Sequence, residues 1–181
     1  MLEIIDKYLQ KWKDLGHQSR PGEIEPEMAD ATQNEDEEWR NWNVIPSKVT
    51  DSEIQEFEES IGFKLPASFK LYLKHKHFYD LQIAECNLCS HPVNIWRSEL
   101  SEMIFNGYPR EYLIDKGRIP FANWSDWGYL CFDTTANCDD FDYPIVLWDH
   151  ERADNFEKKY QNFSSMLYEL DEVDKRMKDE E

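Results

Sequence analysis

Three strand-like runs in the second half of the chain constrain its fold most. Residues 118–124, 128–134 and 143–149 are rich in β-branched and aromatic residues, and polar turns separate them. Because the runs follow one another closely, each strand can return directly beside the previous one. These runs therefore predict an antiparallel meander.

Helical patterns flank these runs. Thr50 and Glu53 have the spacing of a capping box, which predicts a helix that starts at residue 51 and ends before Gly62. Pro66 suits the first turn of a following helix. The helices expected from apolar spacing are 2–15, 51–61, 67–76, 99–105 and 156–170, and further short strands are expected at 78–83 and 92–96.

This order of helices, sheet and helix predicts an α+β fold in a single domain, with a central bent antiparallel sheet flanked by helices. We divide the chain into an N-terminal helix and acidic loop extension at 1–43, the domain proper at 44–170, and a polar tail at 171–181 that we expect to fray.

The segment at 21–40 differs from its surroundings because it is acidic, contains two prolines and has few large apolar residues. It is expected to be an acidic loop whose residues 21–38 are the most mobile internal part of the chain. A short helix from Ile24 or Pro26 to Ala31 is an alternative for part of this segment. Trp39 and Trp42 are expected to anchor its far end on the core.

The charge balance limits the partners of the protein. The 20 Lys and Arg residues are outnumbered by 38 Asp and Glu residues, so the net charge is −18. A chain of this charge is not expected to bind nucleic acid or an anionic membrane, because both need a surplus of basic residues. The same field steers basic partners toward the protein.

The four cysteines, at 86, 89, 131 and 138, are compatible with two interpretations, a metal site or ordinary reduced thiols. Cys86, Cys89 and His91 supply part of a zinc ligand set, but a second pair of closely spaced cysteines is missing. The first residues lack the features of a signal peptide, which favours a cytoplasmic location and reduced thiols. We therefore expect no metal, no cofactor and no structural disulfide.

Known catalytic motifs are missing from the sequence. It contains no nucleophile elbow, no phosphate-binding loop and no dinucleotide-binding fingerprint. Carboxylates are so numerous that pairs of them carry little information about acid–base catalysis. We expect a protein that is not an enzyme and has no catalytic residues.

The order of the motifs resembles the SUKH superfamily, which includes a yeast cell-wall assembly regulator and many bacterial immunity proteins. The resemblance rests on the helical segments at 50–58 and 61–73, the strand segments at 119–122, 127–133 and 143–150, and the closing helix at 163–170. It covers residues 44–170. The turn at 123–127 departs from the glycine-rich turn of many members, and the segment at 86–89 matches no feature of the family.

The resemblance implies a non-enzymatic role. Many bacterial members bind a cognate toxin and block it, and the acidic charge of this chain suits a toxin with a basic surface, such as a nuclease. The alternative is a regulatory or scaffolding module that recruits a partner without inhibiting it.

The turns that bound the central strands are the expected toxin-binding surface, because loops on a rigid sheet carry recognition. Carboxylates beside a tryptophan supply both charge and an apolar anchor. The residues expected to bind are Asp126, Trp127, Asp139, Asp140 and Asp142. The acidic segment at 21–38 is the rival surface. The core is expected to contain Phe57, Phe69, Leu73, Phe121, Leu130, Phe132, Val146 and Leu147.

Overall fold

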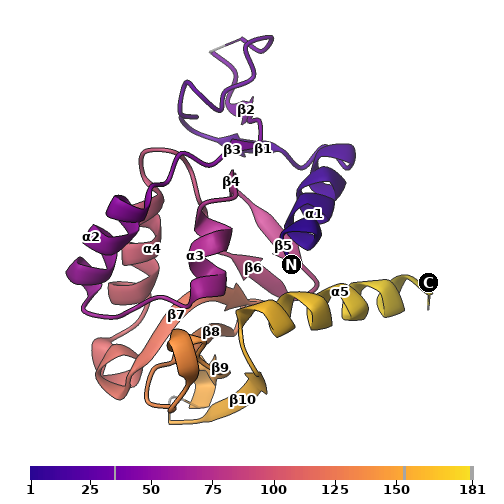
Figure 1. The fold of residues 1–181 in the computed structure, drawn as a ribbon. Helices are drawn as coiled ribbons and strands as arrows, with labels where there is room; N and C mark the ends of the chain where they lie inside the picture. Colours follow the sequence, from indigo (N-terminus) through magenta and orange to yellow (C-terminus); the bar gives the residue numbers. More distant parts are fainter. Residues whose placement is uncertain (35, 153, 180–181) are drawn as a thin grey trace.

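The computed structural model describes residues 1–34, 36–152 and 154–179, except for the side chains of residues 140, 178 and 179 (Figure 1). The α-helices are α1 (Leu2–Asp14), α2 (Asp51–Ile61), α3 (Ala67–Leu73), α4 (Trp96–Phe105) and α5 (Phe163–Asp179). The strands are β1 (Ser19–Pro21), β2 (Trp39–Asn41), β3 (Ile45–Pro46), β4 (Lys76–His77), β5 (Leu81–Ile83), β6 (Cys86–Leu88), β7 (Arg118–Trp124), β8 (Gly128–Asp133), β9 (Ile145–Asp149) and β10 (Phe156–Tyr160). Short 3-10 turns occupy Arg110–Tyr112, Ile114–Lys116, Asp139–Phe141 and His150–Arg152.

Within the described chain, six strands form one sheet, which we call the large sheet. Its order is β10-β9-β8-β7-β6-β5, and every neighbouring pair is antiparallel. Strands that follow one another in sequence are neighbours throughout, so the predicted α+β fold and antiparallel meander are confirmed. The small pairs β1-β2 and β3-β4 lie outside the large sheet.

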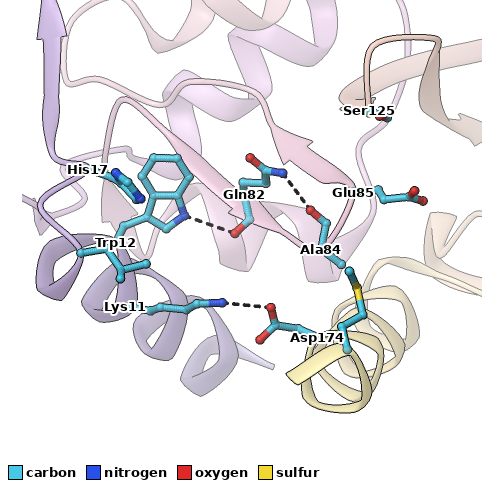
Figure 2. A pocket seen from close by; sticks show the side chains of 10 residues that line it. Lys11, Trp12, His17, Gln82, Ala84, Glu85, Ser125 and Asp174 are labelled. Atoms are coloured by element: carbon cyan, nitrogen blue, oxygen red, sulfur yellow. Dashed lines mark hydrogen bonds and ion pairs between the residues drawn. The ribbon is translucent and has the colours of Figure 1, made fainter. Parts of the chain in front are cut away.

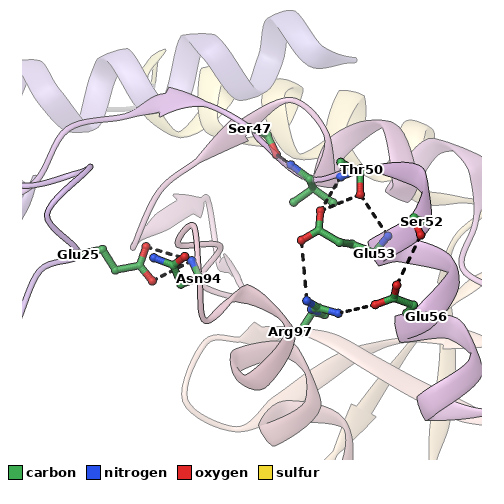
Figure 3. Close-up of polar contacts among 9 residues, drawn as sticks. Glu25, Ser47, Thr50, Ser52, Glu53, Glu56, Asn94 and Arg97 are labelled. Carbon is green, nitrogen blue, oxygen red and sulfur yellow. Dashed lines mark hydrogen bonds and ion pairs between the residues drawn. The ribbon is translucent and has the colours of Figure 1, made fainter.

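The capping box starts α2 as predicted. The Thr50 hydroxyl accepts the Glu53 backbone N–H at 3.2 Å, and the Glu53 carboxylate accepts the Thr50 N–H at 2.8 Å (Figure 3). Gly62 ends the helix in the left-handed conformation, with φ of 76°. Arg97 of α4 donates to Glu56 at 3.2 Å, which holds α2 beside α4 at one end of the molecule (Figures 1 and 3).

One face of the large sheet carries the core. Phe69 of α3 contacts the rings of Phe121 and Phe132, with centroids 5.7 and 5.2 Å away, and these two rings stack at 4.1 Å. Phe163 at the start of α5 closes the group, 5.1 Å from Phe69. All the residues predicted for the core are buried. This core contains Phe57, Phe69, Leu73, Phe121, Leu130, Phe132 and Leu147, whereas Val146 is buried on the opposite face of the sheet.

The opposite face of the large sheet, called the second face below, carries every other residue of the strands. In register across the strands it presents Gln82, Asn87, Asn123, Tyr129, Trp148 and Phe156. The half near β10 is covered by a small apolar cluster that includes Leu113, Val146 and Trp148. The half near β5 is polar and open to solvent, because Gln82 and Asn87 are exposed.

Residues 156–160 correct the sequence prediction, because they form strand β10 and not the first turns of the closing helix. The edge of β9 offers unpaired backbone groups, and β10 pairs with it. The helix starts at Phe163 because Asn162 and Ser165 cap it reciprocally: the Asn162 side chain accepts the Ser165 N–H at 2.8 Å, and the Ser165 hydroxyl accepts the Asn162 N–H at 3.0 Å. The spacing of Phe156 and Tyr160 fits both structures, which explains the error.

Two shorter segments also differ from the prediction. The strand expected at 92–96 does not form, since the chain turns there and Trp96 already opens α4. The region around the cysteines, which matched no expected element, is strand β6, paired with β5 and β7. The residues of β6 alternate between buried and exposed, which is the strand signal that the cysteine pattern obscured.

The acidic segment at 21–40 is attached to the body at its near end. The Glu25 carboxylate accepts the backbone N–H of Asn94 at 2.9 Å (Figure 3) and that of Val93 at 2.7 Å. Met28 is fully buried. Trp42 is 1% exposed and anchors the far end as predicted, whereas Trp39 is 57% exposed, so its predicted anchoring is wrong. The predicted short helix is a turn. The mobility of 21–38 stays a prediction.

The tail at 171–181 also differs from the expectation, because α5 continues to Asp179. Asp171 is buried against α1, where it accepts hydrogen bonds from Lys7 and from the Tyr8 hydroxyl. Lys11 pairs with Asp174 at 2.9 Å. These contacts join α1 to α5. No helix of the described chain is long and apolar enough to span a membrane.

Candidate functional site

A groove runs along the polar half of the second face, between α4 and the large sheet. Its walls are the side of α4 that carries Glu99 and Glu102, and the strand residues Asn87, Asn123 and Tyr129. The cavity has a volume of about 290 Å³. We call it the α4 groove, and it combines carboxylates, amides and a phenol on a rigid sheet.

Three carboxylates line the α4 groove: Asp80, Glu99 and Glu102. Burial raises the pKa of Asp80, and the positive charge of Arg20 opposes this shift. Glu102 accepts a hydrogen bond from the Asn106 amide at 2.6 Å. Within the described residues, none of the three forms an ion pair with Lys or Arg, although the charge of Arg20 acts on Asp80 from a greater distance.

The carboxylate of Glu58 differs from those of the groove because it forms ion pairs with two lysines. Glu58 is buried and bonds Lys64 at 2.9 Å and Lys70 at 2.6 Å. Burial opposes the ionisation of Glu58, but the hydrogen bonds from the two lysines hold its pKa below the usual value. The charge of this group is thus neutralised within the chain, in contrast to the charge of the α4 groove.

The groove continues past the turn between β7 and β8. Asn123 and Tyr129 also line the next hollow, together with Asp126 and His150. A third hollow then follows between Asp126, Trp127 and the residues at 149–151. The predicted residues Asp126 and Trp127 therefore lie at the end of the groove, with Asp126 exposed and Trp127 half-buried.

Aromatic rings make this end of the groove rigid. Tyr108 stacks on the His150 ring, with centroids 6.1 Å apart, and meets the Trp148 ring edge-on at 4.5 Å. The His150 backbone N–H donates to the Trp127 carbonyl at 3.2 Å. Rings held in this way lose little conformational freedom when a partner binds.

The other predicted site residues lie at the far end of β8. The strand has six residues, so its two ends are roughly 20 Å apart. Asp142 accepts hydrogen bonds from Asn162 at 2.7 Å and Ser68 at 3.3 Å, which ties the start of α5 to α3. Asp139 is exposed, and the Asp140 side chain lies outside the described residues. The predicted set is therefore divided between two places.

The cysteine cluster does not assemble a metal site among the described residues. Burial raises the pKa of both Cys86 and Cys89 to about 12, so their thiols are neutral at pH 7. The His91 ring donates to the Leu73 carbonyl at the end of α3 at 2.7 Å. No group of three or more His, Cys, Asp or Glu side chains in the described chain is arranged to hold a metal ion.

Sequence reasoning missed the acidic lining of the α4 groove, because Asp80, Glu99 and the amides come from separate elements. One signal was present. Gln82, Asn87 and Asn123 each interrupt an apolar run at the position where the opposite face of a strand would be. Reading these polar positions as one face would have indicated that half of the sheet is open.

Comparison with known protein families identifies the family of this chain. A SUKH family model with the description SMI1-KNR4 cell-wall matches residues 26–172. This range contains the large sheet and the whole α4 groove. No curated protein matches the chain.

Proposed function

The chain belongs to the SMI1-KNR4 cell-wall family of the SUKH superfamily, and from this premise we propose that it is an immunity protein. In this proposal it acts in the cytoplasm, where it binds a cognate toxin with a basic surface and neutralises it without catalysis, metal or cofactor. The α4 groove and the turn at 125–127 form the binding surface.

The observation that carries the proposal is that Asp80, Glu99 and Glu102 line one groove and form no ion pair among the described residues. The two buried carboxylates Glu58 and Asp171, by contrast, are both paired with lysines. Carboxylates that line one groove without an ion pair repel one another, and a partner's Lys or Arg relieves that repulsion. The amide oxygens of Asn87 and Asn123 offer further acceptors for a guanidinium group.

Inhibition follows if the basic residues that enter the groove are those the toxin uses for its own substrate. A nuclease holds phosphates with Lys and Arg, and a carboxylate-lined groove competes for the same groups. The net charge of −18 also raises the association rate, which matters when a toxin must be captured before it acts.

The family description favours a second candidate function, a regulatory or scaffolding module. Such a module would bind a basic partner in the same groove and leave the partner active. The two functions share the interface and differ in what happens to the partner.

The test uses the protein encoded by the gene directly beside that of this chain. We expect it to arrest growth when produced alone, to be harmless when this chain is co-produced, and to bind this chain in vitro. Binding without growth arrest or protection would indicate the scaffolding module, and absence of binding would contradict the immunity function.

A charge-neutralised variant tests the groove itself. Glu99→Gln with Glu102→Gln should slow association at least about fivefold and weaken its dependence on salt, because the long-range attraction is reduced. The matched control is Glu59→Gln with Glu169→Gln, which changes the net charge equally at exposed positions outside the groove. Equal association kinetics for the two double variants would show that the groove is not part of the interface.

A further inference from the structure

A separate hollow, distinct from the α4 groove and from the two hollows that continue it, lies on the other side of the turn at 125–127. Its walls come from the end of α1, the turn between β5 and β6, Ser125 and the end of α5 (Figure 2). The cavity has a volume of about 520 Å³. We call it the α1–α5 pocket.

Apolar side chains at the mouth of the α1–α5 pocket face solvent. Leu15, which caps the end of α1, is 58% exposed, and Met177 of α5 is 56% exposed. Both line the pocket, although more than 150 residues separate them in sequence. Trp12 is half-buried, and Ala84 adds a methyl group to the same surface. Gathered at one hollow, these side chains offer a partner apolar surface to bury.

The walls of the pocket are fixed to one another by hydrogen bonds and an ion pair. The Trp12 indole donates to the Gln82 carbonyl at 3.3 Å, and the Gln82 amide donates to the Ala84 carbonyl at 2.9 Å (Figure 2). Lys11 and Asp174 join the two helices at 2.9 Å. The pocket is therefore preformed, which lowers the entropy that a bound side chain must offset.

The two turns at the pocket are held in strained conformations. Ala84 and Ser125 have φ of 50° and 51°, in the left-handed region that residues other than glycine rarely adopt. The Ser125 N–H donates to the Glu85 carbonyl at 2.7 Å, which locks one turn against the other. Strain of this kind persists where surrounding contacts over-determine it, and it often marks binding sites.

The charge at the rim defines the occupant. Glu85 is exposed and forms no ion pair within the described residues, while the cation at the rim, Lys11, is already paired with Asp174. Asp126 follows Ser125 directly in the turn that also borders the α4 groove. The rim therefore favours an apolar group whose neighbours are positively charged.

We propose that the α1–α5 pocket receives one aliphatic or aromatic side chain from the basic surface of the partner protein, with a flanking Lys or Arg of the partner beside Glu85. This inference rests on the proposed function and adds an apolar anchor to it. The anchor fills a hydrophobic pocket at one side of the turn at 125–127, and the carboxylates of the α4 groove meet basic residues at the other side.

The first experiment measures dissociation of the protein encoded by the neighbouring gene. Leu15→Ser with Met177→Ser should accelerate dissociation at least about tenfold, because the anchor loses its apolar contacts. Leu71→Ser with Ile95→Ser is the matched control, since Leu71 is 53% exposed and both residues lie away from the pocket. Equal dissociation rates for both double variants would overturn the proposal.

A second experiment does not depend on that protein. The peptide acetyl-Lys-Leu-Lys-amide at millimolar concentration should shift the indole N–H resonance of Trp12 in a saturable manner. The shift should disappear in the Leu15→Ser, Met177→Ser variant and with acetyl-Lys-Ser-Lys-amide. Absence of any shift would contradict the proposal that the pocket binds an apolar side chain. Equal binding of acetyl-Gly-Leu-Gly-amide would contradict the proposal that basic residues flank that side chain.

These measurements separate the two hypotheses. If the neighbouring protein fails to bind the wild-type chain, the immunity function fails and the peptide titration still decides the pocket. If the wild-type chain forms a concentration-dependent dimer that the Leu15→Ser, Met177→Ser variant abolishes, the occupant is a second copy of the chain and the proposed partner is wrong for this pocket.

Discussion

The two faces of the large sheet differ in character although they belong to the same strands. On β8, Leu130 and Phe132 point into the aromatic core. Tyr129 and Cys131, which alternate with them along the strand, face the other side, and Tyr129 lines the α4 groove. The core face is closed by helices α3 and α5. Because alternate residues of a strand point to opposite sides, one run of sequence carries both the stability of the fold and its binding surface.

Because the two faces carry different side chains, the stability of the fold and the binding of a partner can be changed separately. A change on the core face alters packing and should unfold the protein, while a change on the open half of the second face alters what a partner meets. The following variants test this separation.

Phe132→Ala should have the largest effect. It removes a fully buried ring that stacks on Phe121, so it should lower the free energy of unfolding by about 3–5 kcal/mol. Chemical denaturation measures it, and Phe141→Ala is the control because that ring is exposed. A loss below about 1 kcal/mol would show that the core face does not set the stability.

His91 should make stability depend on pH. Burial, with the neighbouring His77 ring, lowers the pKa of His91 to about 3 in the folded state, whereas the pKa of an unfolded histidine is about 6.5. The unfolded chain therefore binds the proton first, and stability falls as the pH drops below about 6.5 toward 3. His91→Gln should reduce the loss between pH 6.5 and 4.5 by about 2–3 kcal/mol.

Denaturation curves of both proteins at a series of pH values measure this effect. Buried carboxylates with lowered pKa values, such as Glu58, add to the loss at lower pH in both proteins and cancel in the comparison. Parallel pH profiles for the two proteins would contradict the role of His91.

Asp142→Ala should have a smaller effect on stability, about 1–2 kcal/mol, because it removes the acceptor that ties Asn162 to the core. It should leave binding of the partner unchanged, since Asp142 lies at the opposite end of β8 from the groove. Trp127→Ala should do the reverse and mainly accelerate dissociation. A binding defect in Asp142→Ala, with stability retained, would join the two ends of β8 into one surface.

The smallest effect on stability is expected for Glu99→Gln with Glu102→Gln. These side chains form no ion pair within the described residues, so the free energy of unfolding should change by less than about 0.5 kcal/mol. Thermal unfolding beside Glu59→Gln, Glu169→Gln measures it. A large loss of stability would show that the groove carboxylates stabilise the fold, and it would contradict the separation of stability and binding between the two faces.

Local patterns predicted the elements that local interactions produce. The capping box of Thr50 and Glu53 acts over three residues, and β8 is a short run rich in aromatic residues between polar turns. For this reason the start of α2, the meander and the core positions such as Phe132 were readable from the chain. The family resemblance has the same origin, since it rests on the order of such segments.

Choices between two local structures depended on tertiary contacts. Residues 156–160 have an apolar spacing that suits a helix, yet the free edge of β9 makes them a strand. Trp39 and Trp42 are three residues apart at the end of the acidic segment, yet only Trp42 is buried. Neither outcome follows from residue type.

The sequence alone determined that this chain is an acidic α+β protein that resembles the SUKH superfamily, with a central antiparallel meander of three strands. Only the tertiary structure decided which acids meet. Asp126 and Asp142 looked like parts of one surface because turns bound both ends of β8, but a strand separates its two ends by its full length. Asp80 and Glu99 became neighbours because a sheet and a helix pack together, and such packing brings together residues that no local pattern relates.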